Sequence, residues 1–152
     1  MLPFLKRKKT RDTGDLIIEA LLTAYYEEER MARQLLEHAE KAPYPFFGKE
    51  LRRLAGEEER QATLLKDKIS SLGGVVPSKE TAAKGGWNHW DRLVADLKDE
   101  QVQRAHYEDQ AIRSGSNFGS LRGMWLELAD EESRHIGVLR ELILRSDPHA
   151  GR

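Results

Sequence analysis

Four long stretches of the sequence carry apolar residues three and four positions apart, which is the spacing of an α-helix that buries one face. They run from 15 to 41, from 45 to 72, from 88 to 113 and from 117 to 145. No stretch shows the alternation of Val, Ile or Thr with polar residues that is typical of a strand. The sequence therefore predicts an all-α protein made of four helices.

The connections between these stretches differ in length. Pro43 and Pro45 separate the first two helices, and residues 114–117 separate the last two. Such short connections make neighbouring helices antiparallel. The connection from Gly73 to about Trp87 is long enough to run along a bundle, which would place the third helix parallel to the second. We expect a four-helix bundle with a long crossover between helices two and three; an up-down bundle with a loose middle loop is the alternative.

The bundle is expected to cover residues 15–146, with short segments outside it. Residues 1–14 form a basic arm that we interpret as flexible, and residues 147–152 form a C-terminal tail. The arm is either a solvated tail or a contact for an anionic lipid surface or a partner. Its apolar residues precede its basic ones, the reverse of a secretory signal, so we expect a cytoplasmic protein.

Composition excludes several classes of protein. The chain has 25 Lys and Arg against 26 Asp and Glu, interleaved along the helices, so we expect no nucleic-acid interface. It has no cysteine, which excludes disulfides, cysteine-ligated clusters and thiol catalysis. No apolar run approaches the ~18 residues that cross a bilayer, so we expect no transmembrane segment.

An internal repeat relates the second helix to the fourth. Residues 54–65 align with residues 128–139 without a gap, and six of the twelve positions are identical. The two segments lie 74 residues apart, about half the length of the chain. The repeat predicts two related helical hairpins that pack as a pseudo-dimer.

Each apolar stripe contains one glutamate at a position that should face the core: Glu28, Glu58, Glu100 and Glu132. In the third helix Asp99 is the alternative to Glu100. A buried carboxylate loses several kcal/mol of solvation, so it must be protonated, paired or bound to a cation. Four of them at one level would repel one another strongly, and divalent cations would relieve that repulsion.

Two of these glutamates begin a motif with i, i+3 spacing, which places both side chains on one face of a helix. The fourth helix contains Glu132-x-x-His135, and the second contains Glu58-x-x-Gln61. One glutamate from each of two helices and a Glu-x-x-His pair from each of the other two form the ligand set of di-iron and di-manganese bundle proteins. Glutamine is a neutral and weaker ligand than imidazole, so the second cation position is expected to be low-affinity, transient or empty.

Residues 54–62 and 128–135 resemble the metal-binding second and fourth helices of the ferritin-like superfamily, with rubrerythrins and bacterioferritins as its nearest members. Residues 72–77, Leu-Gly-Gly-Val-Val-Pro, are similar to the start of the family's crossover. The resemblance implies a ferritin-like four-helix bundle with a non-haem two-iron site, with Mn or Zn as other occupants. That site would react with oxygen or peroxide, as a ferroxidase or a rubrerythrin-like detoxifying protein does. The implied metal ligands are Glu28, Glu58, Gln61, Glu100, Glu132 and His135.

The resemblance also assigns roles. Glu58 and Glu132 would bridge or chelate the metals, His135 would be a terminal nitrogen ligand, and Glu28 and Glu100 would be terminal carboxylates. The expected partners are metal ions, oxygen or peroxide, and further copies of the chain in a dimer or larger homo-oligomer. Two other functions stay open: a structural or interaction module with a degenerate metal site, and a hydroxylase with a substrate-sized cavity beside the metals.

Overall fold

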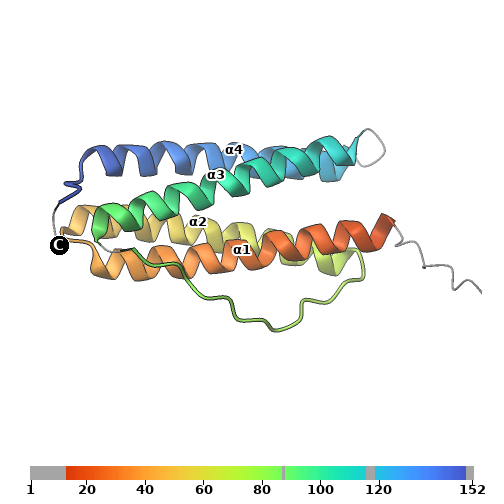
Figure 1. Cartoon of the computed structure of the whole chain (residues 1–152). Helices are drawn as coiled ribbons and strands as arrows, with labels where there is room; N and C mark the ends of the chain where they lie inside the picture. Colours follow the sequence, from red (N-terminus) through yellow and green to blue (C-terminus); the bar gives the residue numbers. More distant parts are fainter. Residues whose placement is uncertain (1–12, 87, 116–118, 150–152) are drawn as a thin grey trace, which may run out of the picture.

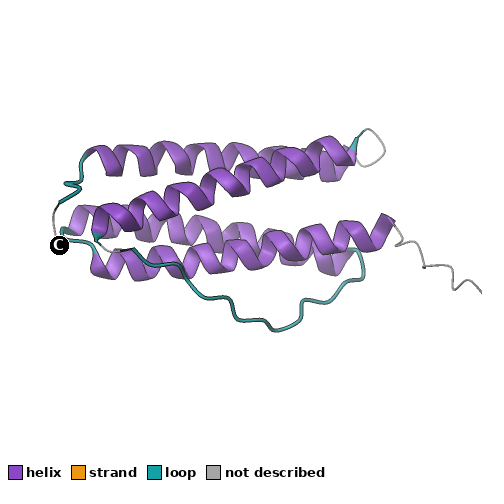
Figure 2. Cartoon of the chain, viewed as in Figure 1, coloured by secondary structure: helices purple, strands orange, loops and turns teal. Residues whose placement is uncertain are grey.

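The computed structural model describes residues 13–86, 88–115 and 119–149, and within them it contains four helices and no strand. The helices are α1 (Thr13–Lys41), α2 (Pro45–Ser71), α3 (His89–Ser114) and α4 (Gly119–Leu144). They lie side by side as a four-helix bundle (Figures 1 and 2). The all-α prediction is confirmed, and the helix bounds differ from the predicted ones by at most two residues. Residues 1–12 of the expected basic arm lie outside the described residues.

The order of the helices follows the predicted lengths of the connections. α1 and α2 run in opposite directions, as do α3 and α4, whereas α2 and α3 run in the same direction (Figure 1). Residues 72–86 run back along the bundle to make this possible. The long crossover is thus confirmed, and the up-down alternative is wrong. No described helix is both long enough and apolar enough to cross a membrane.

Local sequence sets the ends of α2 and α3. Pro45 begins α2. Proline is well suited to this position, because the N–H groups of the first turn of a helix have no carbonyl partner within the helix and proline has no N–H. At the other end the N–H of Gly74 donates to the Ile69 carbonyl (2.9 Å), and Gly73 has φ +81°, which a glycine adopts without strain. Asn88 caps α3, because its side-chain oxygen accepts from the N–H of Asp91 (2.8 Å). These caps determine where the crossover starts and ends.

The core consists of two hydrophobic clusters, one toward each end of the bundle. The first includes Leu21, Leu65 and Trp125, and the second includes Leu35 and Leu51. Along every helix the predicted glutamate lies between the residues of the two clusters. The bundle therefore has an apolar layer at each end and a polar layer in the middle.

Candidate metal centre

Four glutamates, one from each helix, form the middle layer of the core. Glu28, Glu58 and Glu132 are 0% exposed, and Glu100 is 1% exposed. Each occupies a position on its helix where the apolar stripe continues on both sides, so the helix that buries the stripe also buries the carboxylate.

Three of these glutamates converge with a histidine. Glu58, Glu100, Glu132 and His135 each offer one ligand atom, and these four atoms lie within 4.8 Å of one another. His135 and Glu132 project together from α4 because three residues separate them. All four groups are types that bind divalent iron, manganese or zinc.

His135 is held by carboxylates on two sides. Its Nδ1 lies 3.0 Å from Glu58 Oε1 and 3.5 Å from Glu100 Oε2. Its Nε2 lies 2.8 Å from Glu57 Oε2, at the more exposed edge of the site. A second carboxylate that accepts from the far ring nitrogen is a common way of orienting a histidine ligand.

Glu28 lies beside this group rather than within it. Its Oε1 accepts a hydrogen bond from the Tyr107 hydroxyl and one from Gln103 Nε2 (3.2 Å). Burial raises the pKa of Glu28 well above its usual range, and the charge of Glu58 raises it further. The two side chains are therefore close enough to interact electrostatically.

The carboxylate oxygens that line the centre have an unusual feature: six of them are buried without a hydrogen-bond partner among the described residues. They are Glu28 Oε2, Glu58 Oε2, both oxygens of Glu100 and both oxygens of Glu132. Buried polar atoms almost always have a partner, because an unsatisfied one costs about 1–3 kcal/mol. A set of oxygens that lack donors but face one another fits bound cations, so the residues present fit a metal centre.

The same crowding shifts the proton affinities of the centre. Burial raises the pKa of Glu58 to about 8, with the nearby charge of Glu100 adding to the effect. Burial also raises the pKa of Glu100. Burial alone would lower the pKa of His135, but the carboxylates of Glu100 and Glu58 outweigh it and raise that pKa to about 11. In the absence of cations the centre therefore holds protons at neutral pH, which a metal would have to displace.

Gln61, which stands where the motif would have a second histidine, is also buried and is 2% exposed. Its Nε2 donates a hydrogen bond to Glu131 Oε2, whereas its Oε1 is buried and has no partner in the described part of the chain. The structure thus leaves an amide oxygen available on the second helix.

The structure separates the two acidic residues considered for the third helix. Glu100 joins Glu58, Glu132 and His135, whereas Asp99 faces α1 and the crossover. Asp99 accepts from Arg30 (3.1 Å), Gln34 (2.9 Å) and Lys84 (2.8 Å). Its carboxylate is therefore already paired.

Solved structures of other proteins share this arrangement of helices. A ferritin-like diiron-carboxylate protein from Bacillus anthracis is 17% identical, with a TM-score of 0.81 over 88% of this chain and 99% of that one. The dodecameric thioferritin of Bacteroides fragilis, a bacterioferritin-related protein, is 19% identical, with a TM-score of 0.79 over 87% of this chain and 86% of that one. The chain has the ferritin-like fold. No protein-family model matches the sequence, and no curated protein matches it.

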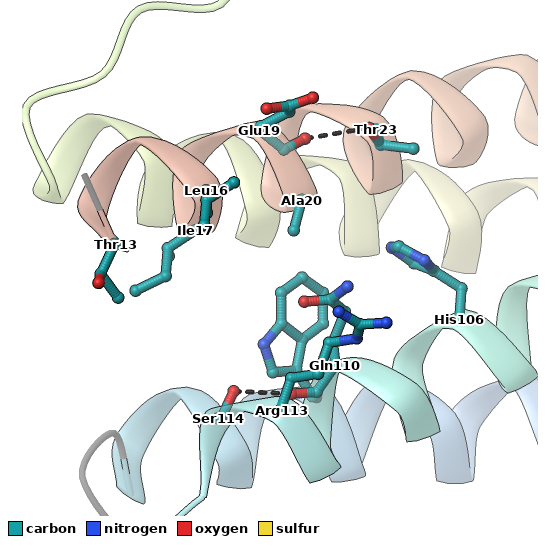
Figure 3. Close-up of a pocket in the computed structure, with 11 residues that line it drawn as sticks. Thr13, Leu16, Ile17, Glu19, Ala20, Thr23, His106, Gln110, Arg113 and Ser114 are labelled. Atoms are coloured by element: carbon teal, nitrogen blue, oxygen red, sulfur yellow. Dashed lines mark hydrogen bonds between the residues drawn. The ribbon is translucent and has the colours of Figure 1, made fainter. Parts of the chain in front are cut away.

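A surface pocket of the ferritin-like bundle lies away from this centre. It has a volume of about 440 Å³ and lies between the start of α1 and the end of α3, with His106 and Trp125 in its lining (Figure 3). None of the six predicted metal ligands lines it. Tyr107, which is 0% exposed, packs its ring on Trp125 and bonds to Glu28, and so it lies between pocket and centre. This pocket is therefore not a cavity beside the candidate centre, which is where a hydroxylase would need one.

Sequence reasoning assigned no role to four residues that contact the predicted ligands: Glu57, Glu131, Gln103 and Tyr107. The first two occupy equivalent positions of the internal repeat, one residue before Glu58 and Glu132, and this equivalence was a usable signal. Gln103 follows Glu100 by three residues, the same spacing as Glu58 and Gln61. Neither pattern says by itself which partner each side chain contacts.

Proposed function

We propose that this ferritin-like bundle binds two divalent metal ions, iron first among them, and reacts through them with oxygen or peroxide. The observation that supports the proposal is the group of six buried carboxylate oxygens without donors, next to His135. The ligands would be Glu28, Glu58, Gln61, Glu100, Glu132 and His135, with Mn or Zn as other occupants.

The chain's residues have distinct roles in this proposal. Glu58 and Glu132, the equivalent glutamates of the internal repeat, would supply carboxylate oxygens to the metals. Hard, anionic oxygens stabilise iron in its ferric as well as its ferrous state. Two ferrous ions held this way would supply the electrons that reduce oxygen or peroxide. The apolar layers on both sides keep bulk water away from the centre.

Tyr107 has a supporting role. Its hydroxyl proton is donated to Glu28 Oε1, which leaves Glu28 Oε2 free to bind a cation. Gln103 donates to the same Oε1 and to the Tyr107 hydroxyl (3.0 Å). The two residues thus orient the Glu28 carboxylate without occupying both of its oxygens.

Metal analysis of the protein purified after growth in iron tests the proposal. We expect one metal ion per chain to stay bound and a second to bind more weakly because of Gln61, and we expect Glu58→Ala and Glu132→Ala each to abolish binding while the helical circular dichroism signal persists. Glu59→Ala, next to Glu58 but exposed, is the matched control and should keep the metal. If both inner variants retain full metal content, the ligand set is wrong.

The same measurement separates the alternative function. Near-zero iron, zinc and manganese in the wild-type protein would favour a structural or interaction module with a degenerate site. If iron is bound, oxidation of added ferrous ions by oxygen and by peroxide should be compared, because a faster reaction with peroxide favours detoxification over storage.

We also propose that the chain assembles with itself. The bacterioferritin-related neighbour is a dodecamer. Light scattering on the purified protein should show a dimer or a larger particle, and a mass of 17.4 kDa would exclude assembly.

A further inference from the structure

The two sides of the centre are related by the internal repeat, but they carry different donors. Gln61 is equivalent to His135, and Glu57 is equivalent to Glu131, at the offset of 74 residues. His135 bonds to Glu57 of α2, and Gln61 bonds to Glu131 of α4. Each inner side chain is thus held by the glutamate of the other helix, in a reciprocal arrangement that retains the pseudo-twofold symmetry of the repeat.

The Glu131 contact determines the orientation of the Gln61 amide. A carboxylate only accepts hydrogen bonds, so it must receive the amide NH₂ group. The amide oxygen is then directed away from Glu131, and it is buried without a partner. By the same symmetry His135, whose Nε2 contacts Glu57, directs its Nδ1 toward Glu58 and Glu100. By the symmetry of the repeat the Gln61 oxygen is the counterpart of His135 Nδ1, so one side of the centre carries a nitrogen donor and the other an oxygen donor.

We propose that the two cation positions differ in their metal preference, and that Glu131 is the positioning residue that makes the second one an all-oxygen position. This inference depends on the metal binding proposed above. The first position uses His135 with Glu58, Glu100 and Glu132. The second uses the Gln61 oxygen with the carboxylates of Glu28, Glu58 and Glu132.

The donor sets predict the preference. Imidazole binds zinc and ferrous iron well, whereas carboxylate and carbonyl oxygens suit manganese. Every site of this kind binds Zn²⁺ more tightly than Mn²⁺, but the margin shrinks when the nitrogen donor is removed. The Glu57 carboxylate further strengthens His135 as a ligand. With limited zinc and ample manganese, the centre should therefore hold Zn²⁺ on the His135 side and Mn²⁺ on the Gln61 side.

Metal titration of the metal-free full-length chain measures this preference directly. One equivalent of Zn²⁺ is added first, and Mn²⁺ is then titrated while the six-line electron paramagnetic resonance signal of free Mn²⁺ reports what stays unbound. We expect one Mn²⁺ to bind beside the zinc. For each of the two metal ions bound, the dissociation constant for Mn²⁺ is divided by the dissociation constant for Zn²⁺. We expect this ratio to be at least ~10-fold smaller for the second ion bound than for the first.

Two variants test the residues behind the effect. Gln61→His supplies a nitrogen donor at the second position, so Zn²⁺ should bind there roughly tenfold tighter. The Mn²⁺ to Zn²⁺ ratio of dissociation constants for the second ion should then rise toward the ratio for the first. Glu131→Ala frees the Gln61 amide to rotate, so Mn²⁺ should bind ~10-fold more weakly at the second step while the first Zn²⁺ is unaffected. Glu127→Ala removes an exposed glutamate one turn earlier on α4 and should change neither step.

The outcomes distinguish the two proposals. If the wild-type chain binds no metal at all, the proposed function fails and this inference fails with it. If it binds two ions with equal Mn²⁺ to Zn²⁺ ratios, the proposed function stands and the difference between the positions is refuted. If Glu131→Ala behaves like Glu127→Ala, Glu131 has no positioning role.

Discussion

Burial of the Glu58 carboxylate lowers the stability of the metal-free protein. It is 0% exposed, its Oε1 contacts His135, and its Oε2 has no partner among the described residues. Replacing a charged acid by a neutral group of the same shape often stabilises a protein when the charge was buried. A cation bound as proposed above would offset the cost of burying Glu58.

The pKa of Glu58 predicts how the stability of the metal-free protein changes with pH. The folded chain keeps a proton on Glu58 up to about pH 8, whereas the unfolded chain loses it near pH 4.5. Stability must therefore fall as pH rises between these values. The raised pKa of His135 acts in the same direction above pH 6.5.

We expect the thermal midpoint of the metal-free protein to drop between pH 5.5 and pH 8. Glu58→Gln should flatten that drop and raise the midpoint at pH 8 by at least ~3 °C. Glu59→Gln, on the exposed face, should follow the wild-type curve. Differential scanning calorimetry with a chelator present makes the comparison, and parallel curves for wild type and Glu58→Gln would contradict the assignment.

The crossover shows how an element without secondary structure is held in place. The Tyr26 hydroxyl donates to the Pro77 carbonyl, and Arg33 donates to Thr81. The Lys84 carbonyl accepts from His38 Nε2 (3.1 Å). Side chains of α1 thus bind the backbone of the segment at several points.

Gln34 connects the crossover to both α1 and α3. Its Oε1 accepts from Arg30 (2.8 Å) and from the N–H of Lys84 (2.7 Å). Its Nε2 donates to Asp96 (2.8 Å) and Asp99 (2.9 Å). All of its hydrogen-bonding capacity is used, in a residue that is 1% exposed.

Gln34→Leu should therefore destabilise the chain by about 3 kcal/mol, because it leaves several buried partners unsatisfied. Arg33→Ala removes only exposed contacts of the same segment and should cost less than ~1 kcal/mol. Urea denaturation gives both values. Protease cleavage within residues 73–86 should also be faster in Gln34→Leu; equal stability of the two variants would show that the network adds nothing.

At the scale of the whole molecule, the two apolar clusters support the polar layer between them. α1 packs mainly on α2 and α3 mainly on α4, whereas α1 packs less closely on α3, and α2 less closely on α4. The carboxylates from both pairs meet between these units, so the clusters at the two ends must hold the pairs together.

Leu51→Ala and Leu65→Ala, one in each cluster, should each cost about 2–5 kcal/mol of stability. Because neither residue is a ligand, both variants should keep the wild-type metal content under conditions in which they are folded. Leu64→Ala is the control, since Leu64 is 43% exposed and should cost little. Chemical denaturation and metal analysis of the same samples provide the test; loss of metal from a folded variant would mean that the centre needs the packing of that end.

Most of the architecture could be predicted from the sequence, because it depends on local patterns. The four stripes, the short and long connections and the breaks at Pro45 and Gly73 act over a few residues, and they specify an all-α bundle with a crossover. The glutamates were also visible, because each interrupts an apolar stripe that the helix must bury. The i, i+3 spacing of Glu132 and His135 places both side chains on one face of the helix, whatever other helices pack against it.

Only the tertiary structure decided which atoms meet. Asp99 and Glu100 are adjacent in sequence but lie about 100° apart around α3, so the rotation of that helix assigns one to the centre and the other to Arg30. The pairing of Glu131 with Gln61 likewise depends on how α2 and α4 are rotated and shifted against each other. These quantities result from the packing of all four helices at once, and for that reason no single stretch of sequence contains them.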